Sequence, residues 1–240
     1  FHIDLSALAS AIGERTKAVL VNSPNNPTGA VYGEEELTAL ARLLKEKSAQ
    51  YNKSIFIIAD EPYRELTYGA KVPYIPALYS ETIVCYSFSK SLSLAGERIG
   101  YIAVSPACAG SEEIFSAVCG AGRSLGYVCA PALFQRVCAK LLGQSGDIRV
   151  YKRNRDLLYN ALIKAGFTCS KPQGAFYLFM KSPLPSATEF CEMAKKHELL
   201  LVPSDSFGIE GYVRISTCVD YGMIERSLPA FSALAKECGL

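Results

Sequence analysis

Four short apolar runs in the first half of the sequence limit what this chain can fold into. The runs are rich in β-branched residues, and polar or turn residues bound them at 18–22, 55–60, 83–87 and 99–104. Such runs are typical of strands buried on both faces of a sheet. Between the first two runs, residues 34–47 carry leucines at helical spacing. We therefore predict a βαβ unit and a largely parallel sheet.

The remainder of the chain follows a different pattern. A helix is expected near the start, at 4–12, and broken helical segments are expected over 114–142. From there, helices and strands alternate in an α+β pattern, with helices predicted at 147–165, 186–198 and 221–237 and strands at 175–180, 199–202 and 212–217. This change predicts two domains, 1–149 and 150–240.

Composition excludes several classes of protein. The 240 residues include 25 basic and 23 acidic side chains, and the net charge of +2 does not suggest a surface for nucleic acid or membrane. The two histidines are isolated, so a histidine-based metal site is not expected. Nine cysteines occur singly with no C-x-x-C pair, which favours a reducing cytoplasm over secretion. The start at Phe1, without methionine and almost directly in a helical pattern, suggests a truncated N-terminus.

Polar side chains gather where the predicted parallel strands end. The first strand is followed by the run 23–29, with sequence SPNNPTG, and the second ends in Asp60, shortly before Tyr63. The third leads into Ser87, Ser89 and Lys90, and Arg98 precedes the fourth. Ligands of open α/β sheets bind outside the carboxyl ends of parallel strands. The sequence thus predicts one cleft lined by these side chains.

Each of these residues also has an ordinary structural interpretation. An acidic residue at a strand end is most often a helix cap or a solvated turn, and a lone lysine is usually a surface residue. The run Asn26–Gly29 is a good turn by composition alone. Arg98 and Arg214 could be simple ion-pair partners. The joint placement at strand ends favours a functional site, because unrelated surface residues need not all fall there.

Five segments together resemble a known family. SPNNPTG, IADEPY, SFSK, GERIGY and YVRIS look like the motifs of class I/II aminotransferases of fold type I, the aspartate aminotransferase-like enzymes, and they occur in the same order. The resemblance extends over 1–240. It implies an α/β fold, in which a large domain with a mostly parallel sheet binds pyridoxal 5′-phosphate (PLP) and a smaller α+β domain follows.

The resemblance also implies roles for four residues around the cofactor ring. Lys90 would form a Schiff base with PLP and then move the proton at the substrate Cα, which requires an amine that can become neutral. Asp60 would pair with the pyridine nitrogen and keep it protonated. Tyr63 and Asn26 would hydrogen-bond the phenolic oxygen of the ring.

A second set would bind the charged groups. Arg98, with Ser87 and Ser89, would hold the phosphate, for which the planar guanidinium is well suited. Arg214 would bind the substrate α-carboxylate and orient the Cα–H bond, with Asn26 also facing the substrate. No metal ligand is implied.

Some features of this family differ here or are weaker. The Gly-rich turn and the aromatic ring that stacks on PLP normally come from upstream of Phe1, and the usual Pro-Gly before the Phe-Gly loop is Pro203-Ser204. Arg123 is a weak candidate for reading a second carboxylate. Residues 174–177 would line the substrate entrance, and the family suggests a cis bond between Asn26 and Pro27.

Three functions remain open from the sequence. The leading hypothesis is transfer of an amino group from an L-amino acid to a 2-oxo acid through a pyridoxamine form, by a homodimer. A C–S β-lyase of the same fold is an alternative, although such relatives tend to carry isoleucine and histidine where Pro62 and Tyr63 stand. A PLP-sensing domain of a transcription regulator is the third. The amino donor is not readable from the sequence.

Overall fold

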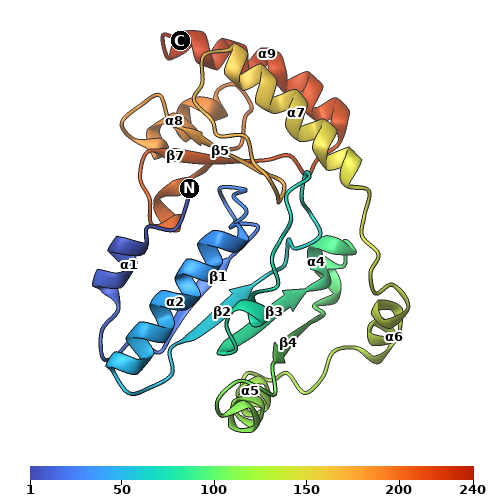
Figure 1. Ribbon diagram of the computed structural model, residues 1–240. Helices are drawn as coiled ribbons and strands as arrows, with labels where there is room; N and C mark the ends of the chain where they lie inside the picture. Colours follow the sequence, from blue (N-terminus) through green and yellow to red (C-terminus); the bar gives the residue numbers. More distant parts are fainter. The chain divides into compact units, whose positions relative to one another are not determined.

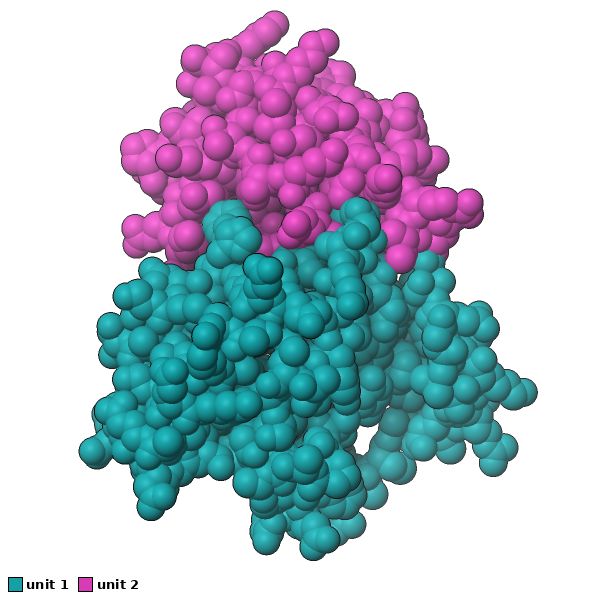
Figure 2. All heavy atoms as spheres, in the orientation of Figure 1, with its two compact units in different colours: residues 1–24, 31–146 teal, residues 25–30, 147–240 magenta.

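The computed structural model describes residues 1–240, and the chain folds into two compact units (Figures 1 and 2). The first unit consists of residues 1–24 and 31–146, and the second of 25–30 and 147–240. The chain therefore passes into the second unit for six residues, 25–30, long before the main crossing at 146–147.

A four-stranded sheet forms the centre of the first unit. Its strands are β1 (Ala18–Asn22), β2 (Phe56–Asp60), β3 (Thr82–Ser87) and β4 (Gly100–Val104), in the spatial order β1-β2-β3-β4. The first three strands are parallel, as predicted, and β4 runs antiparallel to β3. The sheet is thus mostly parallel, with one antiparallel edge.

The prediction of burial on both faces is wrong for β4. Four of its five residues are exposed, and Tyr101 and Ile102 keep 48% and 50% of their surface accessible. The other edge strand, β1, also exposes Leu20. In the two central strands every second residue is buried and the others are partly buried. The apolar runs therefore predicted where the strands lie, but they did not predict how deeply each strand is buried.

One helix accounts for most of the core of the first unit. Helix α2 (Glu34–Gln50) begins with three glutamates in its first turn, which suits the positive end of the helix dipole. Its four fully buried side chains, Leu37, Leu40, Ala41 and Leu44, lie in one apolar cluster with strand residues such as Ile57 and Ala59. Figure 1 shows α2 and the short α1 (Leu5–Ala11) close to the β1 edge of the sheet.

The remaining elements of the first unit are helices. They are α3 (Ile75–Leu78), α4 (Phe88–Ser91), η1 (Ala95–Glu97), α5 (Ser111–Ser124) and α6 (Ala132–Lys140). A groove of about 1330 Å³ lies beside β4 and is lined by Tyr101, Ile102, Phe115 and further residues of α5 and the 127–131 segment. Its lining does not include Lys90, Asp60 or Tyr63.

The second unit is an α+β structure, as predicted from its changed sequence pattern. Its three-stranded antiparallel sheet has the order β5-β7-β6, and the elements in chain order are α7 (Ile148–Lys164), β5 (Tyr177–Lys181), α8 (Ala187–Lys195), β6 (Val202–Pro203), η2 (Ser204–Phe207), β7 (Tyr212–Ser216) and α9 (Tyr221–Glu237). The strand expected at 199–202 is only the two-residue β6. The core of this unit contains the fully buried side chains of Phe179 in β5 and Phe190 in α8. Leu162 of α7 and Leu234 of α9 are buried in the same cluster as Phe190.

Segment 25–30 is held in the second unit by backbone hydrogen bonds. The carbonyl of Gly29 accepts from the N–H groups of Gln173 and Gly174, at 2.9 and 3.0 Å. Gly29 has φ +69°, a left-handed conformation that favours glycine. A Cβ at this position would lie 2.2 Å from Cβ of Pro172 and 2.9 Å from the carbonyl oxygen of Gly174. The Asn26–Pro27 bond is cis, as expected, and Ser23–Pro24 is cis as well.

Replacing Gly29 by alanine is therefore expected to destabilise the protein. The left-handed backbone costs about 1–2 kcal/mol for a residue with a Cβ, and the overlap with Pro172 adds about 1–3 kcal/mol. Denaturant unfolding would measure the loss. Gly13→Ala is the matched control, because a Cβ there meets nothing within 4 Å and φ lies outside the left-handed region. Equal stabilities for the two variants would contradict the packing described for segment 25–30.

None of the helices combines the length and the apolar character needed to cross a lipid bilayer.

Candidate functional site

The strands of the first unit's sheet bring several of the predicted site residues to one edge of the sheet. Asn22 at the end of β1 is in register with Asp60 at the end of β2, and Asp60 is in register with Cys85 of β3. Ser87 ends β3 opposite Gly100, the first residue of β4. Because β4 runs antiparallel, its beginning lies at the same edge, so Arg98 is brought there too. The predicted gathering of these side chains at one edge is what this register produces.

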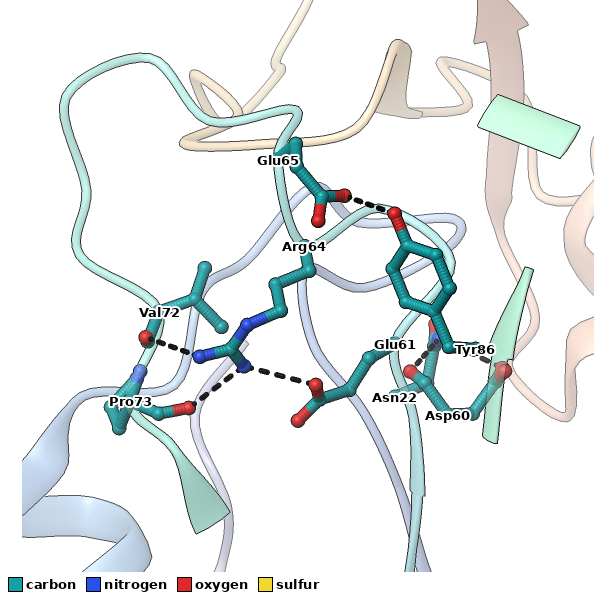
Figure 3. A network of polar contacts seen from close by, with 8 residues as sticks. All are labelled: Asn22, Asp60, Glu61, Arg64, Glu65, Val72, Pro73 and Tyr86. Carbon is teal, nitrogen blue, oxygen red and sulfur yellow. Dashed lines mark hydrogen bonds and ion pairs between the residues drawn. The ribbon is translucent and has the colours of Figure 1, made fainter. Parts of the chain in front are cut away.

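Asp60 is held by a neighbour that sequence reasoning did not select. The Asn22 side-chain amide donates to Oδ2 and to the backbone carbonyl of Asp60, both at 2.9 Å (Figure 3). Burial raises the pKa of Asp60 above its usual range, and the hydrogen bond from Asn22 partly offsets this rise. The sequence could have indicated Asn22 only by its position, because Asn22 ends the strand next to the one that Asp60 ends. The pair presents a fixed carboxylate whose charge a cationic partner would stabilise.

The raised pKa of Asp60 predicts a pH-dependent gain in stability when the charge is removed. A carboxyl group with a raised folded-state pKa stabilises the fold below its unfolded pKa, near 3.8, and loses that contribution as pH rises through the folded value. Asp60→Asn should therefore raise the melting temperature of the PLP-free protein at neutral pH, and the gain should shrink on acidification towards pH 4.

Asp147→Asn provides a control of opposite sign. The hydrogen bond from the exposed Arg149 holds the pKa of Asp147 below its usual range, so its ionised form is the favoured one. This variant should lose a little stability at neutral pH. Thermal scans between pH 4 and 8 measure both. A neutral-pH loss in Asp60→Asn would mean that the Asp60 charge is stabilised by the fold and not penalised.

Lys90 and Tyr63 lie close together. Lys90 belongs to the one-turn helix α4, which directly follows β3; the Ser87 hydroxyl accepts from the N–H of Ser89 at 3.2 Å and caps this helix. The Lys90 Nζ lies 5.9 Å from the centre of the Tyr63 ring, within range of a cation–π contact. Tyr63 is buried, whereas Lys90 is partly exposed. An amine and a phenol thus share one small region beyond the ends of β2 and β3.

The three residues predicted to bind phosphate occupy the same edge. The hydroxyls of Ser87 and Ser89 are 2.7 Å apart. Arg98 is exposed, has a left-handed backbone with φ 53°, and donates to the carbonyl of Ala95 at 2.9 Å. Two hydroxyls and a guanidinium are suitable donors for an anion.

The second unit contributes a separate pair. The guanidinium of Arg214, in β7, donates to Oδ1 of Asn26 at 3.0 Å. It also lies within cation–π distance of two aromatic rings, 4.6 Å from the centre of Tyr177 and 4.9 Å from that of Phe207. Aromatic rings this close attract the guanidinium through cation–π contacts and restrict its motion. This arrangement is suited to a carboxylate. Phe207 had not been assigned a role from the sequence.

Arg123 lines the same groove as Arg98, but this groove does not include Lys90, Asp60 or Tyr63. Arg123 is an exposed residue of α5, and the groove lies beside β4. A role for Arg123 in reading a second carboxylate stays a prediction.

Comparison with known proteins identifies the family. The model of the family described as "Aminotransferase class I and II" matches residues 1–231. This chain belongs to the class I and II aminotransferase family. A probable aspartate aminotransferase of Methanocaldococcus jannaschii is 34% identical over 242 residues, which cover 95% of this chain and 61% of that protein. An aspartate aminotransferase of Bacillus subtilis is 33% identical over 247 residues, covering 95% and 60%.

Solved structures of aminotransferases share the fold. An amino transferase from Eubacterium rectale superposes with a TM-score of 0.96 at 52% identity, over 100% of this chain and 61% of that one. The aspartate aminotransferase of Thermotoga maritima gives 0.86 at 29% identity, over 98% and 60%. The fold is thus that of fold type I aminotransferases. The chain spans about three fifths of the length of these relatives.

The residues of this aminotransferase chain fit PLP, the cofactor that the family uses. PLP carries an aldehyde, a basic ring nitrogen, a phenolic oxygen and a phosphate. The first unit offers an amine, a carboxylate fixed by Asn22, a phenol, and a group of two hydroxyls and a guanidinium. The chemical types of the donors therefore correspond, one by one, to the groups that would be bound.

Proposed function

We propose that the protein containing this chain is a PLP-dependent aminotransferase that moves an amino group from an L-amino acid to a 2-oxo acid. One observation carries the proposal: a lysine in the one-turn helix after β3 lies over the ring of a buried tyrosine that follows β2, and β2 ends in an aspartate that a neighbouring asparagine holds. Family membership supports the same reaction. In this proposal residues 1–149 are the rest of the large, PLP-binding domain and 150–240 the small one.

When bound, PLP supplies an aldehyde that condenses with amines and a protonated ring that withdraws electrons from the substrate Cα. Lys90 would hold the cofactor covalently and carry the proton at Cα, as a general base and acid. Asp60 would keep the proton on the ring nitrogen. Its raised pKa in the PLP-free protein should fall when a positive ring nitrogen lies beside it, since an opposite charge favours the ionised carboxylate.

The other polar residues would bind and orient. Tyr63 would donate to the phenolic oxygen, and Ser87, Ser89 and Arg98 would hold the phosphate. In the second unit, Arg214 would bind the α-carboxylate, and Asn26, already hydrogen-bonded to it, would complete that donor set. Holding the carboxylate fixes the direction of the Cα–H bond and lowers the entropy cost of proton transfer.

Relatives support an amino-acid substrate without fixing which one. Their names include an aspartate aminotransferase of Bacillus subtilis, a probable aspartate/prephenate aminotransferase of Aquifex aeolicus and an aromatic-amino-acid aminotransferase of Thermococcus litoralis. We propose L-aspartate and aromatic amino acids as the first donors to test. We also propose that the whole protein is a homodimer.

The test is a half-reaction on the whole protein loaded with PLP. Each L-amino acid is added alone while the absorption spectrum is followed, and a 2-oxo acid is added afterwards. We expect a lasting loss of the visible band with a productive donor and its return with the oxo acid. Release of ammonia and pyruvate from a cysteine conjugate, with no lasting spectral change, would point to a β-lyase. Tight PLP binding without any reaction would point to a sensor.

A further inference from the structure

The segments that carry Lys90 and Tyr63 are joined by one buried hydroxyl, that of Tyr86. Tyr86 lies in β3, and only 9% of its surface is exposed. Its hydroxyl lies 2.8 Å from Oγ of Ser91 and 2.8 Å from Oε2 of Glu65 (Figure 3 shows the Glu65 bond). Ser91 is the residue after Lys90, and Glu65 comes two residues after Tyr63. The hydroxyl thus bonds a neighbour of each of the two residues.

The direction of each hydrogen bond follows from counting protons. A phenol has one proton, and the carboxylate of Glu65 can only accept, so Tyr86 donates to Glu65. The Ser91 hydroxyl then donates to the phenolic oxygen of Tyr86. Burial is the main reason that the pKa of Tyr86 is raised far above its usual range, so the phenol keeps its proton at any working pH. The result is a directed chain, Ser91 to Tyr86 to Glu65.

This chain of hydrogen bonds joins two short elements. Helix α4 has a single turn, Phe88–Ser91, and Ser91 is 1% exposed at its end. On the other side, residues 61–66 form turns, in which the N–H of Leu66 donates to the carbonyl of Tyr63 at 2.8 Å. Arg64 fastens the same loop, donating to Glu61 and to the carbonyls of Val72 and Pro73 (Figure 3). Breaking the Tyr86 bonds would remove one connection between α4 and this loop and leave the contact of Lys90 with the Tyr63 ring.

We propose that Tyr86 is a positioning residue that sets the distance between the Lys90 amine and the Tyr63 phenol, acting through Ser91 and Glu65. The inference rests on the proposed function, since it gives these two groups a shared cofactor. A tyrosine buried only for packing would also satisfy its hydroxyl, but its partners need not come from the two segments that carry the reactive groups. The two explanations differ in what removal of the hydroxyl does to the site.

The test compares Tyr86→Phe with two matched variants of the whole protein. Tyr86→Phe keeps the ring, which stacks on Tyr101 at 5.0 Å and packs edge-on against Phe88 at 5.2 Å, and removes only the hydroxyl. Tyr101→Phe is the control, because the Tyr101 hydroxyl forms no hydrogen bond. Glu65→Gln is the conservative variant, because its amide oxygen can still accept from Tyr86. Should Tyr86→Phe fail to fold, Ser91→Ala removes the other link of the chain.

Hydrogen exchange without PLP is the first readout. Loss of one hydrogen bond of ordinary net strength should speed amide exchange roughly fivefold in both 61–66 and 88–92 of Tyr86→Phe. Exchange should be unchanged in Tyr101→Phe and nearly so in Glu65→Gln. Faster exchange in one segment alone, or in neither, would contradict the proposal that Tyr86 connects the two segments.

The visible absorption of the PLP-loaded protein is the second readout, and a purely structural role would not move it. We expect the pH midpoint of the visible band to shift by about half a pH unit in Tyr86→Phe. The shift should have the same direction as in Tyr63→Phe, and the double variant should shift no further than Tyr63→Phe alone. Faster exchange with an unmoved midpoint would make Tyr86 a packing residue only. A parent protein that forms no visible band would contradict the proposed function, and exchange would then decide on the bridge alone.

Discussion

Lys90→Ala is expected to abolish the visible band that PLP forms with the whole protein and to lower turnover by about 10⁴-fold or more. The variant removes the amine that would bind PLP covalently and also the group that would carry the proton at the substrate Cα. Lys90 Nζ lies 5.9 Å from the Tyr63 ring, and α4 places it just beyond the end of β3. Absorption spectra and turnover with the best amino donor measure the two losses.

Two further variants separate the chemistry of Lys90 from its charge. Lys90→Arg keeps a positive charge but lacks a nucleophilic amine, and it should behave like Lys90→Ala. Lys45→Ala, at an exposed position of α2, should leave both readouts unchanged. Borohydride reduction of the PLP-loaded protein, followed by peptide mass mapping, should place the added mass on the Lys90 peptide. Its appearance on another lysine would exclude the assignment of Lys90.

Arg214→Gln is expected to lower kcat/KM for amino-acid donors roughly 100-fold, the effect of losing two charge-assisted hydrogen bonds worth about 3 kcal/mol together. The visible band of bound PLP should stay as it is. Asn26 and the rings of Tyr177 and Phe207 hold the guanidinium in place, so the loss concerns binding of the carboxylate and not packing alone. Steady-state kinetics with donor and oxo acid measure it.

A substrate without a carboxylate makes the test of Arg214 specific. The parent protein and Arg214→Gln should convert a simple primary amine equally slowly, because neither can bind a group that the amine lacks. Arg214→Lys keeps the charge but not the planar fork, and it should recover only part of the loss. Arg149→Gln, an exposed arginine paired with Asp147, serves as the control. An equal loss for amine and amino acid in Arg214→Gln would mean that Arg214 does not act on the carboxylate.

The sequence predicted the positions of most elements. β1 begins and ends where the apolar run does, and β2, β3 and β4 differ from their runs by one residue at the start. The direction of β4 was not specified, because an apolar run indicates a strand but not which way it points. The connection from β3 holds only a one-turn helix and a 3₁₀ turn, which is too little for the crossover helix that usually joins parallel strands.

The site was predictable where local sequence determines it and not where contacts between distant residues do. Strand ends and motifs selected Asp60, Tyr63 and Lys90, whose local placement follows from short connections to the sheet. Asn22 and Tyr86 were missed, because their importance lies in side-chain contacts with residues 38 and 21 positions away, Asp60 and Glu65. A sequence pattern along one strand contains no information on such partners. The assignment of catalytic roles stays a prediction, which the variants above examine.

The excursion of residues 25–30 into the second unit bears on how this protein is made. The ribosome releases these residues early, but Gln173, Gly174 and Arg214, which bind them, emerge much later. During that interval the strands of the first unit are already outside the ribosome, but segment 25–30 lacks the residues that bind it. Cutting the gene at residue 146 would therefore not yield two complete modules, since each half would lack a piece that the other encodes.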